Sequence, residues 1–280
     1  ERLVLGTYDI FQEGEKPVLD HVQTVASILE SSDIDQSMIV DIIRGNQKNH
    51  PFLGELLNSV VDVDQIDYLL RDSYYTGVAY GMIDSQRFTQ TIEIYNDHLA
   101  LDRKGVGVVE NILMARALMY SSVYFHKTVR IAELMLSKAM ESIPDMHPFD
   151  FFKLNDAELV GMMKNKGNYQ HGIITRLKYR RLFKQVYVML PQNRNEERMQ
   201  LLKRLEDNDV RRSMEARFEE GLSIPEGHVI IAVPRMDLMA AEPRIQEIDM
   251  PVLENDGVQM LTTYTPVAAA IGMRKIPDWD

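Results

Sequence analysis

The sequence predicts a mainly α-helical protein with a small α+β subdomain at its C-terminal end. Through most of the first 180 residues, apolar side chains recur at intervals of three and four, which is typical of amphipathic helices. Runs rich in β-branched and aromatic residues come later, at 185–190, 229–233 and 260–265. With 45% hydrophobic and 26% charged residues, the 280-residue chain has the composition of an ordinary soluble globular protein.

Local signals define the first three helices. Residues 20–30 carry an apolar stripe and are expected to form the first helix, capped by Asp20. The second begins at Ser32 or Asp33 and ends at Gly45, because glycine favours the left-handed conformation that closes a helix. A short helix follows over 52–59.

Residues 62–73 concentrate charge on one predicted helix, with four aspartates and one arginine within 11 residues. Helical spacing places a polar set along one side, namely Asp64, Tyr68, Arg71 and Asp72. The opposite side is apolar and includes Ile66, Leu69 and Leu70. Because stacked carboxylates repel one another, a cation, basic partners or water must offset them. A solvated helix face is the alternative interpretation.

The longest predicted helix spans about 107–141. Its apolar stripe leaves Arg116, Tyr124 and Lys127 on one broad face, with His126 at the border. From spacing alone, surface ion pairing is the favoured interpretation of this face.

Further helices are expected over 156–163, 170–179 and 194–220, and strands over the three late β-like runs. We divide the chain into a core (1–145), connecting helices (146–190) and an α+β subdomain (191–280).

Charge is unevenly distributed along the chain, whose net charge is −11. Residues 1–110 contain 8 Lys/Arg against 19 Asp/Glu, whereas residues 164–217 contain 14 against 6. An acidic half suits a cation site, and a basic segment suits an anion such as a nucleotide or RNA. A solvated helix surface explains the basic segment equally well.

The chain has no cysteine, which excludes disulfides and thiolate chemistry and fits a reducing cytoplasm. No apolar run is long enough to span a membrane, and no signal peptide is visible. The seven histidines are scattered, without the spacing of a helical zinc site.

Two clusters in the chain, 62–77 and 109–127, resemble segments of the HD-domain deoxynucleoside triphosphate triphosphohydrolases. The first contains D-x-D-x-x-D-Y-L-x-R-D-S, and the resemblance extends over about 18–190. It implies an HD-domain helical core. It also implies metal-dependent hydrolysis of a deoxynucleoside triphosphate to a deoxynucleoside and inorganic triphosphate.

The resemblance also implies a role for individual residues. Asp64 is the expected ligand of a divalent metal ion (Mg, Mn, Fe or Zn), and His21 is the expected catalytic acid near the phosphate. The remaining expected residues bind substrate: Tyr68, Asp72, Tyr124 and His126 at or near the sugar, and Arg116 and Lys127 at the phosphates.

The sequence departs from the family pattern at three places. Val22 replaces a glutamate, and Gln65 stands where vertebrate members have a lysine. No His-Asp dipeptide occurs in the chain, and family spacing would place that metal-binding dyad before Glu1.

The expected partners are a dNTP substrate, a possible activating nucleotide and further copies of the chain, in a dimer to hexamer. A membrane is not expected, and nucleic acid is possible but not favoured. Two other functions remain open: a catalytically incomplete nucleotide-binding regulatory subunit, and a helical RNA- or protein-interaction module.

Overall fold

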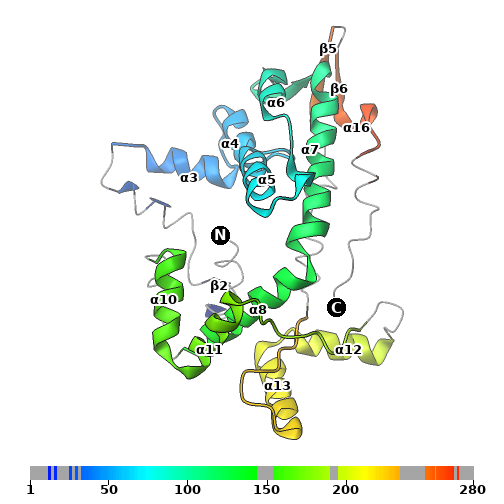
Figure 1. Ribbon diagram of the computed structural model, residues 1–280. Coiled ribbons are helices and arrows are strands. Elements are labelled where there is room, and N and C mark those ends of the chain that lie inside the picture. The colour runs from blue at the N-terminus through cyan, green and yellow to red at the C-terminus, as the bar shows by residue number, and fades with distance from the viewer. Residues whose placement is uncertain are drawn as a thin grey trace. The chain divides into compact units, whose positions relative to one another are not determined.

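The computed structural model describes residues 12–13, 16–17, 25–26, 29–30, 33–143, 154–189, 195–233, 250–255, 257–267 and 270 (Figure 1). The chain divides into two compact units, each described by itself. Unit 1 comprises Glu1–Leu19, Phe125–Met236 and Asp278–Asp280, and unit 2 comprises Asp20–Tyr124 and Asp237–Pro277. Helices dominate the described residues, so the predicted mainly α class with a small β part is confirmed.

Unit 2 is built from helices around a four-stranded sheet. The helical elements are α3 (Gln36–Arg44), α4 (Pro51–Asn58), α5 (Val63–Thr76), η1 (Ala79–Gly81), α6 (Ser85–Thr91), η2 (Arg103–Gly105), α7 (Val106–Met119), the π-helical turn η3 (Tyr120–Tyr124) and α16 (Leu261–Tyr264). Its core contains Leu69, Ile112 and Met119, which are all fully buried. Burial of such side chains is the main stabilising contribution.

The sheet of unit 2 joins distant parts of the sequence. Its strands, in spatial order, are β3 (Ile92–Tyr95), β4 (His98–Asp102), β5 (Pro251–Glu254) and β6 (Gly257–Met260). β4 and β5 are parallel, with Leu101 opposite Val252, and the other two pairs are antiparallel. Both of these residues are completely buried, so the C-terminal hairpin contributes to the core of unit 2.

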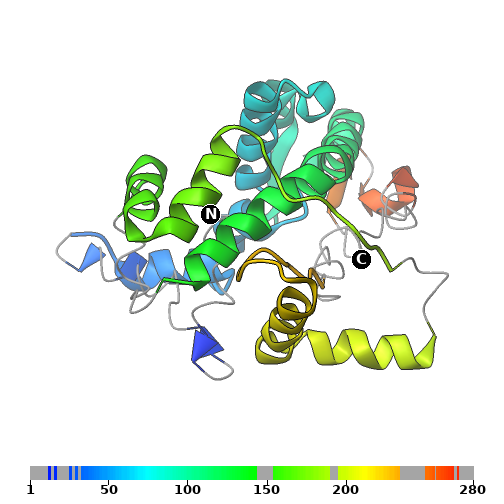
Figure 2. The same cartoon turned by 60° about the horizontal axis from the view of Figure 1, so that its bottom comes forward.

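Unit 1 contains α8 (Lys127–Glu141), α10 (Asp156–Lys166), α11 (Asn168–Lys178), α12 (Glu196–Leu205), α13 (Asn208–Leu222) and the short pair β1 (Gln12–Glu13) and β2 (Lys16–Pro17). α10 lies beside α11 (Figure 2). Met135, Met163 and Ile173 come from three different helices and are buried together.

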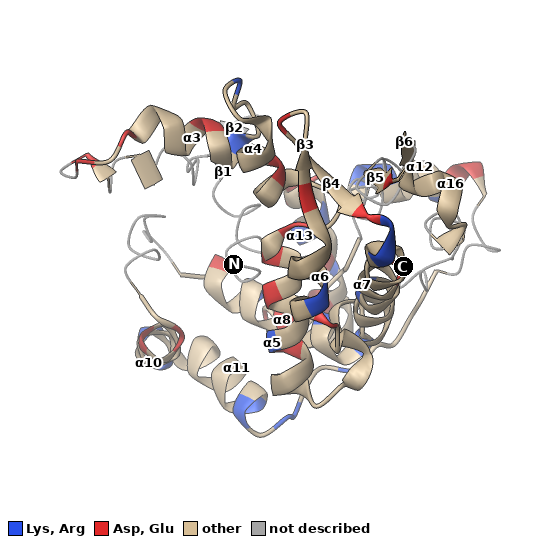
Figure 3. Cartoon of the chain, turned by 90° about the horizontal axis from the view of Figure 1, so that it is seen from above, with Lys and Arg blue, Asp and Glu red and all other residues tan. Residues whose placement is uncertain are grey.

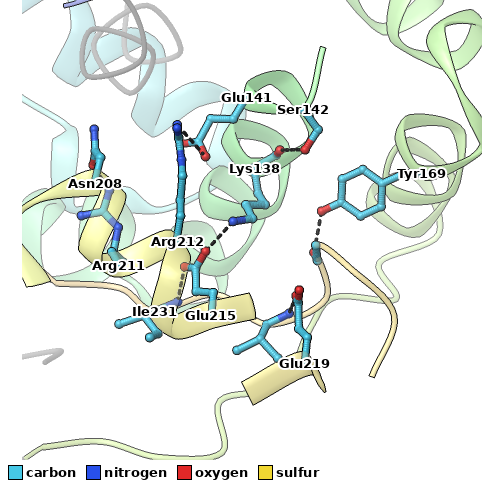
Figure 4. A network of polar contacts seen from close by, with 12 residues as sticks. Lys138, Glu141, Ser142, Tyr169, Asn208, Arg211, Arg212, Glu215, Glu219 and Ile231 are labelled. Atoms are coloured by element: carbon cyan, nitrogen blue, oxygen red, sulfur yellow. Dashed lines mark hydrogen bonds and ion pairs between the residues drawn. The ribbon is translucent and has the colours of Figure 1, made fainter. Parts of the chain in front are cut away.

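Two buried glutamates on α13 hold the segment that follows it (Figure 4). Glu215 Oε1 accepts a hydrogen bond from Ile231 N, and Glu219 Oε1 accepts one from Val229 N, each at 2.8 Å. Lys138 on α8 forms an ion pair with Glu215. The strand predicted over 229–233 does not form, because the amides of Val229 and Ile231 donate to carboxylates rather than to a neighbouring strand.

The strands predicted over 185–190 and 260–265 also differ from the structure. Residues 185–189 have no regular structure, and Val186 is 96% exposed, so the predicted strand does not form over these residues. The strand expected over 260–265 ends at Met260, because Leu261 N bonds back to Met250 O and α16 begins.

Helix boundaries differ from expectation at several points. α3 starts after Asp35, whose Oδ1 accepts hydrogen bonds from Ser37 N and Met38 N, although Gly45 ends it as predicted. The helix expected over 20–30 lies largely outside the described residues. The region predicted to be helical over 194–220 contains two helices, α12 and α13, and Asp207 caps the second.

The continuous helix expected over 107–141 is wrong. α7 gives way to the π-helical turn η3 at Tyr120, and α8 begins only after His126. His126 leaves the helical conformation (ψ 129°), and its Nδ1 accepts a hydrogen bond from Thr128 N at 3.2 Å. This side chain therefore caps a new helix.

Across the described residues, every helix is too short or too polar to cross a lipid bilayer.

Candidate functional site

The site begins with the capping of α5. The side chain of Asp62 accepts a hydrogen bond from Gln65 N at 2.7 Å, and Gln65 Nε2 donates to the other carboxylate oxygen at 3.1 Å. Both residues are 2% exposed. Capping satisfies amides that have no partner in the first turn of a helix. At the other end, Gly77 closes the helix with a positive φ of 70°.

α5 buries the face formed by Gln65, Leu69 and Ser73. The predicted polar set lies beside that face: Asp64 is exposed, whereas Tyr68 and Asp72 are half-buried. Their spacing of four residues aligns them along the helix, as the sequence predicts. Arg71 instead pairs with Asp67 on the same helix, so this arginine belongs to an exposed ion pair.

The end of α5 that carries Asp72 is held by close packing against η1. Ser73 Oγ donates a hydrogen bond to Val78 O at 2.7 Å. A Cβ atom at Gly81 would lie 2.5 Å from Leu69 O, so only glycine fits this approach. The position of Asp72 is thus fixed by the packing of its neighbours.

Arg116 reaches the site from α7, a helix that is otherwise largely apolar and buried. The arginine is itself only 6% exposed. Its Cζ atom lies 5.5 Å from the centre of the Tyr120 ring, one turn further along the chain. A guanidinium at this distance from an aromatic ring is stabilised by the cation–π interaction.

The π-helical turn η3 brings Tyr124 to α5. A turn with i→i+5 hydrogen bonds is wider than an α-helical turn, and such turns occur often at functional sites. Tyr124 is 7% exposed, and its hydroxyl donates to Asp72 Oδ2 at 2.5 Å. This hydrogen bond joins the two predicted substrate-binding segments.

Tyr68 and Tyr120 both pack against the ring of Tyr124. The ring centres of Tyr68 and Tyr124 are 6.0 Å apart with planes at 69°, and those of Tyr120 and Tyr124 are 5.0 Å apart at 82°. Both pairs have the edge-to-face arrangement that aromatic rings favour. We call these three residues, with Asp72 and Arg116, the tyrosine cluster.

The tyrosine cluster contains four of the predicted site residues and one that was missed. The sequence predicted Tyr68, Asp72, Arg116 and Tyr124. Tyr120 was not predicted, although its spacing of four residues from both Arg116 and Tyr124 was a usable signal. The tyrosines, the carboxylate and the guanidinium together offer hydrogen-bonding groups, aromatic faces and one fixed positive charge.

Three predicted residues remain, namely His126, Lys127 and His21. His126 caps α8, and Lys127 is its first residue, so both belong to unit 1 and are exposed. His21 lies outside the described residues.

A metal site is not completed by the residues that the structure describes. Asp64 offers one exposed carboxylate in the first turn of α5. Within the described ranges, no three His, Asp or Glu side chains come together in a group that could hold a metal ion. Divalent ions in proteins draw on several ligands, so these residues alone do not fit one.

Comparison with known proteins identifies the family. Residues 83–280 match the HD associated region family, and the chain belongs to it. An uncharacterized protein of Methanocaldococcus jannaschii is 30% identical over 84% of this chain and 50% of its own length. YwfO of Bacillus subtilis, also uncharacterized, is 33% identical over 46% of this chain and 32% of its own length.

Two further similar proteins have named activities. The deoxynucleoside triphosphate triphosphohydrolase SAMHD1 of Danio rerio is 29% identical over 42% of this chain and 20% of its own length. A phosphohydrolase from Bacteroides thetaiotaomicron has a similar fold, with a TM-score of 0.67 and 18% identity over 97% of this chain and 73% of its own. The chain spans half or less of the length of the curated relatives described here.

Proposed function

We propose that this chain belongs to a phosphohydrolase that cleaves deoxynucleoside triphosphates to a deoxynucleoside and inorganic triphosphate. The observation that carries the proposal is the hydrogen bond from Tyr124 to Asp72 within the tyrosine cluster. It brings together two segments whose sequences independently resemble the dNTP triphosphohydrolases. The relationship to SAMHD1 proteins supports the same reaction.

The tyrosine cluster has the chemistry to hold a nucleotide. A half-buried carboxylate and tyrosine hydroxyls suit the hydroxyl groups of a sugar, since both can accept hydrogen bonds. Aromatic faces pack against apolar parts of the ligand. The fixed charge of Arg116 would offset phosphate charge, and arginine is well suited to phosphate recognition. In this proposal Tyr68, Asp72 and Tyr124 bind the sugar side, and Arg116 the phosphate side.

The family resemblance implies a divalent metal, which would polarise a phosphate and activate water. Because the described residues do not form a complete metal site, we assign no step of the reaction to a metal. The proposal includes Asp64 as a metal ligand and His21 as the catalytic acid, the roles that the family resemblance implies.

A nucleotide-binding regulatory subunit without turnover is the second candidate. It is supported by the tyrosine cluster itself, because these residues could bind a nucleotide without a metal ion. Such a protein would use the same tyrosine cluster to bind a nucleotide, and binding would raise its thermal stability without releasing a product.

Product analysis of the full-length natural protein separates the two candidates. The protein would be incubated with each of the four dNTPs and the four NTPs, and inorganic triphosphate would be separated from diphosphate and phosphate. Triphosphate release from dNTPs supports the hydrolase. Thermal stabilisation by dNTPs with no product at any metal concentration supports the regulatory subunit. If dNTPs cause no stabilisation and no product is released, both candidate functions are contradicted.

A further inference from the structure

A second surface, in unit 1, combines exposed aromatic rings with positive charge. It consists of Lys178, Tyr179, Arg180, Arg181, Lys184 and Tyr187, and we call it the basic-aromatic surface. All six side chains are exposed, with Tyr179 at 61% and Tyr187 at 68%. Figure 3 shows the positive residues at the end of α11 and along the chain that follows it.

This surface lies in a stretch of sequence without acidic residues. Between Glu158 and Glu196 there are 8 Lys/Arg and no Asp or Glu, although the whole chain carries a net charge of −11. In the part of unit 1 that the structure describes, the surface's four cations form no ion pair. By contrast, Lys138 and Arg212 of the same unit are both paired with glutamates. The charge of the surface is therefore available to an external anion.

The surface spans the end of α11 and the irregular segment that follows it. Arg180 has a positive φ of 52°, which is uncommon for a residue other than glycine and turns the chain out of α11. Residues 181–189 then run without regular structure, and Val186 in their middle is 96% exposed. Lys178 Nζ lies 5.5 Å from the centre of the Tyr179 ring, so charge and aromatic face adjoin.

We propose that the basic-aromatic surface binds single-stranded nucleic acid. Proteins that bind single strands combine cations along the backbone with aromatic rings on which unpaired bases stack. Acidic protein partners would use the cations but have no need of the two exposed rings. A duplex would also use the cations, but its stacked bases are not available to the tyrosines. The proposal does not depend on the hydrolase, because it uses none of the residues of the tyrosine cluster.

Fluorescence anisotropy with the full-length protein tests this proposal. The probes are labelled 20-nucleotide oligo(dT), oligo(U) and a DNA duplex of equal length, each titrated at several salt concentrations. We expect both single strands to bind more tightly than the duplex. The logarithm of the affinity should fall with the logarithm of salt concentration by about 0.7 for each phosphate contacted.

Variants separate stacking from charge. The double change Tyr179→Ala with Tyr187→Ala should weaken single-strand binding by at least about tenfold, since each stacked base contributes substantially. Tyr179→Phe with Tyr187→Phe keeps both rings and should bind as the wild type does. Arg181→Gln with Lys184→Gln should reduce the salt dependence of the affinity for single strands. Lys203→Gln with Arg204→Gln on α12 removes the same charge elsewhere and should change little.

Several results would overturn the proposal. The first is that the protein binds no oligonucleotide, and the second is that it binds duplex and single strands with equal affinity. The third is that the α12 control variant loses as much salt dependence as Arg181→Gln with Lys184→Gln. Unchanged binding in a folded Tyr179→Ala, Tyr187→Ala protein would do the same. A difference between oligo(dT) and oligo(U) would indicate which nucleic acid is preferred, and a preference for either supports the proposal.

Discussion

The hydroxyl of Tyr124 donates a hydrogen bond to Asp72 Oδ2 at 2.5 Å, across 52 positions of sequence. Tyr124 lies in the π-helical turn η3, and Asp72 lies in the last turns of α5. The hydrogen bond therefore fixes the relative position of two helical segments that both carry proposed substrate-binding residues.

Tyr124→Phe should weaken both the fold and the site. The change removes a hydrogen bond to a carboxylate, which typically contributes about 1.5–3 kcal/mol. We expect the free energy of unfolding to fall by about 1–2 kcal/mol, because Asp72 is only half-buried and water can replace part of the interaction. Urea unfolding measures this loss. Unchanged stability would mean that the hydrogen bond contributes nothing.

Tyr120 should act as a positioning residue, because its ring packs against both the Arg116 guanidinium and the Tyr124 ring. Tyr120→Leu should raise the KM for dNTPs by about tenfold, since an aromatic pair and a cation–π contact together amount to about 1–2 kcal/mol. Tyr120→Phe keeps the ring and should behave as the wild type. If both variants lose activity equally, the hydroxyl rather than the ring matters, and the positioning role is wrong.

Glu215→Gln should strongly destabilise unit 1. Glu215 is 3% exposed and pairs with Lys138, and removing one partner of a buried pair typically costs about 3–5 kcal/mol. The control is Glu133→Gln on α8, which breaks an exposed pair with Arg130 and should cost less than about 1 kcal/mol. Chemical unfolding compares the two. Similar small losses in both variants would show that the buried pair is not important.

Tyr169 should make stability depend on alkaline pH. Burial raises the pKa of Tyr169 above its usual value near 10, and its hydroxyl donates to Gly227 O at 2.5 Å (Figure 4). Because the folded state favours the neutral phenol, the stabilisation is complete below pH 10 and is lost as the pH rises above it. Between pH 8 and pH 11, the free energy of unfolding should therefore fall more for the wild type than for Tyr169→Phe. Equal slopes would contradict the assignment.

Local periodicity was sufficient to predict part of the site. Asp64, Tyr68 and Asp72 lie in line on α5, because spacing of four residues is a property of any α-helix. The same reasoning failed beyond Met119, where the π-helical turn rotates the following residues and His126 begins a new helix. The hydrogen bond between Tyr124 and Asp72 depends on that turn, so a regular helical pattern could not predict it.

Long-range contacts explain the remaining errors. β-branched residues at 229–233 favour a strand, but their amides meet the carboxylates of α13. The hairpin β3–β4 was missed, although Asn96 and Asp97, both with positive φ, provide a typical turn signal. The pairing of β4 with β5 joins segments about 150 residues apart. Local sequence patterns do not indicate which distant strands pair.

The most direct test of the proposed function compares two aspartates on α5. Triphosphate release from dNTPs would be measured for the full-length wild type, Asp72→Asn and Asp67→Asn, with stability checked for each. Asp72 belongs to the tyrosine cluster, whereas Asp67 pairs with Arg71 on an exposed face. We expect Asp72→Asn to lower kcat/KM by roughly tenfold or more, the loss expected for one charged hydrogen bond, and Asp67→Asn to leave it unchanged. No triphosphate release by the wild type, or equal activity in both variants, would contradict the account.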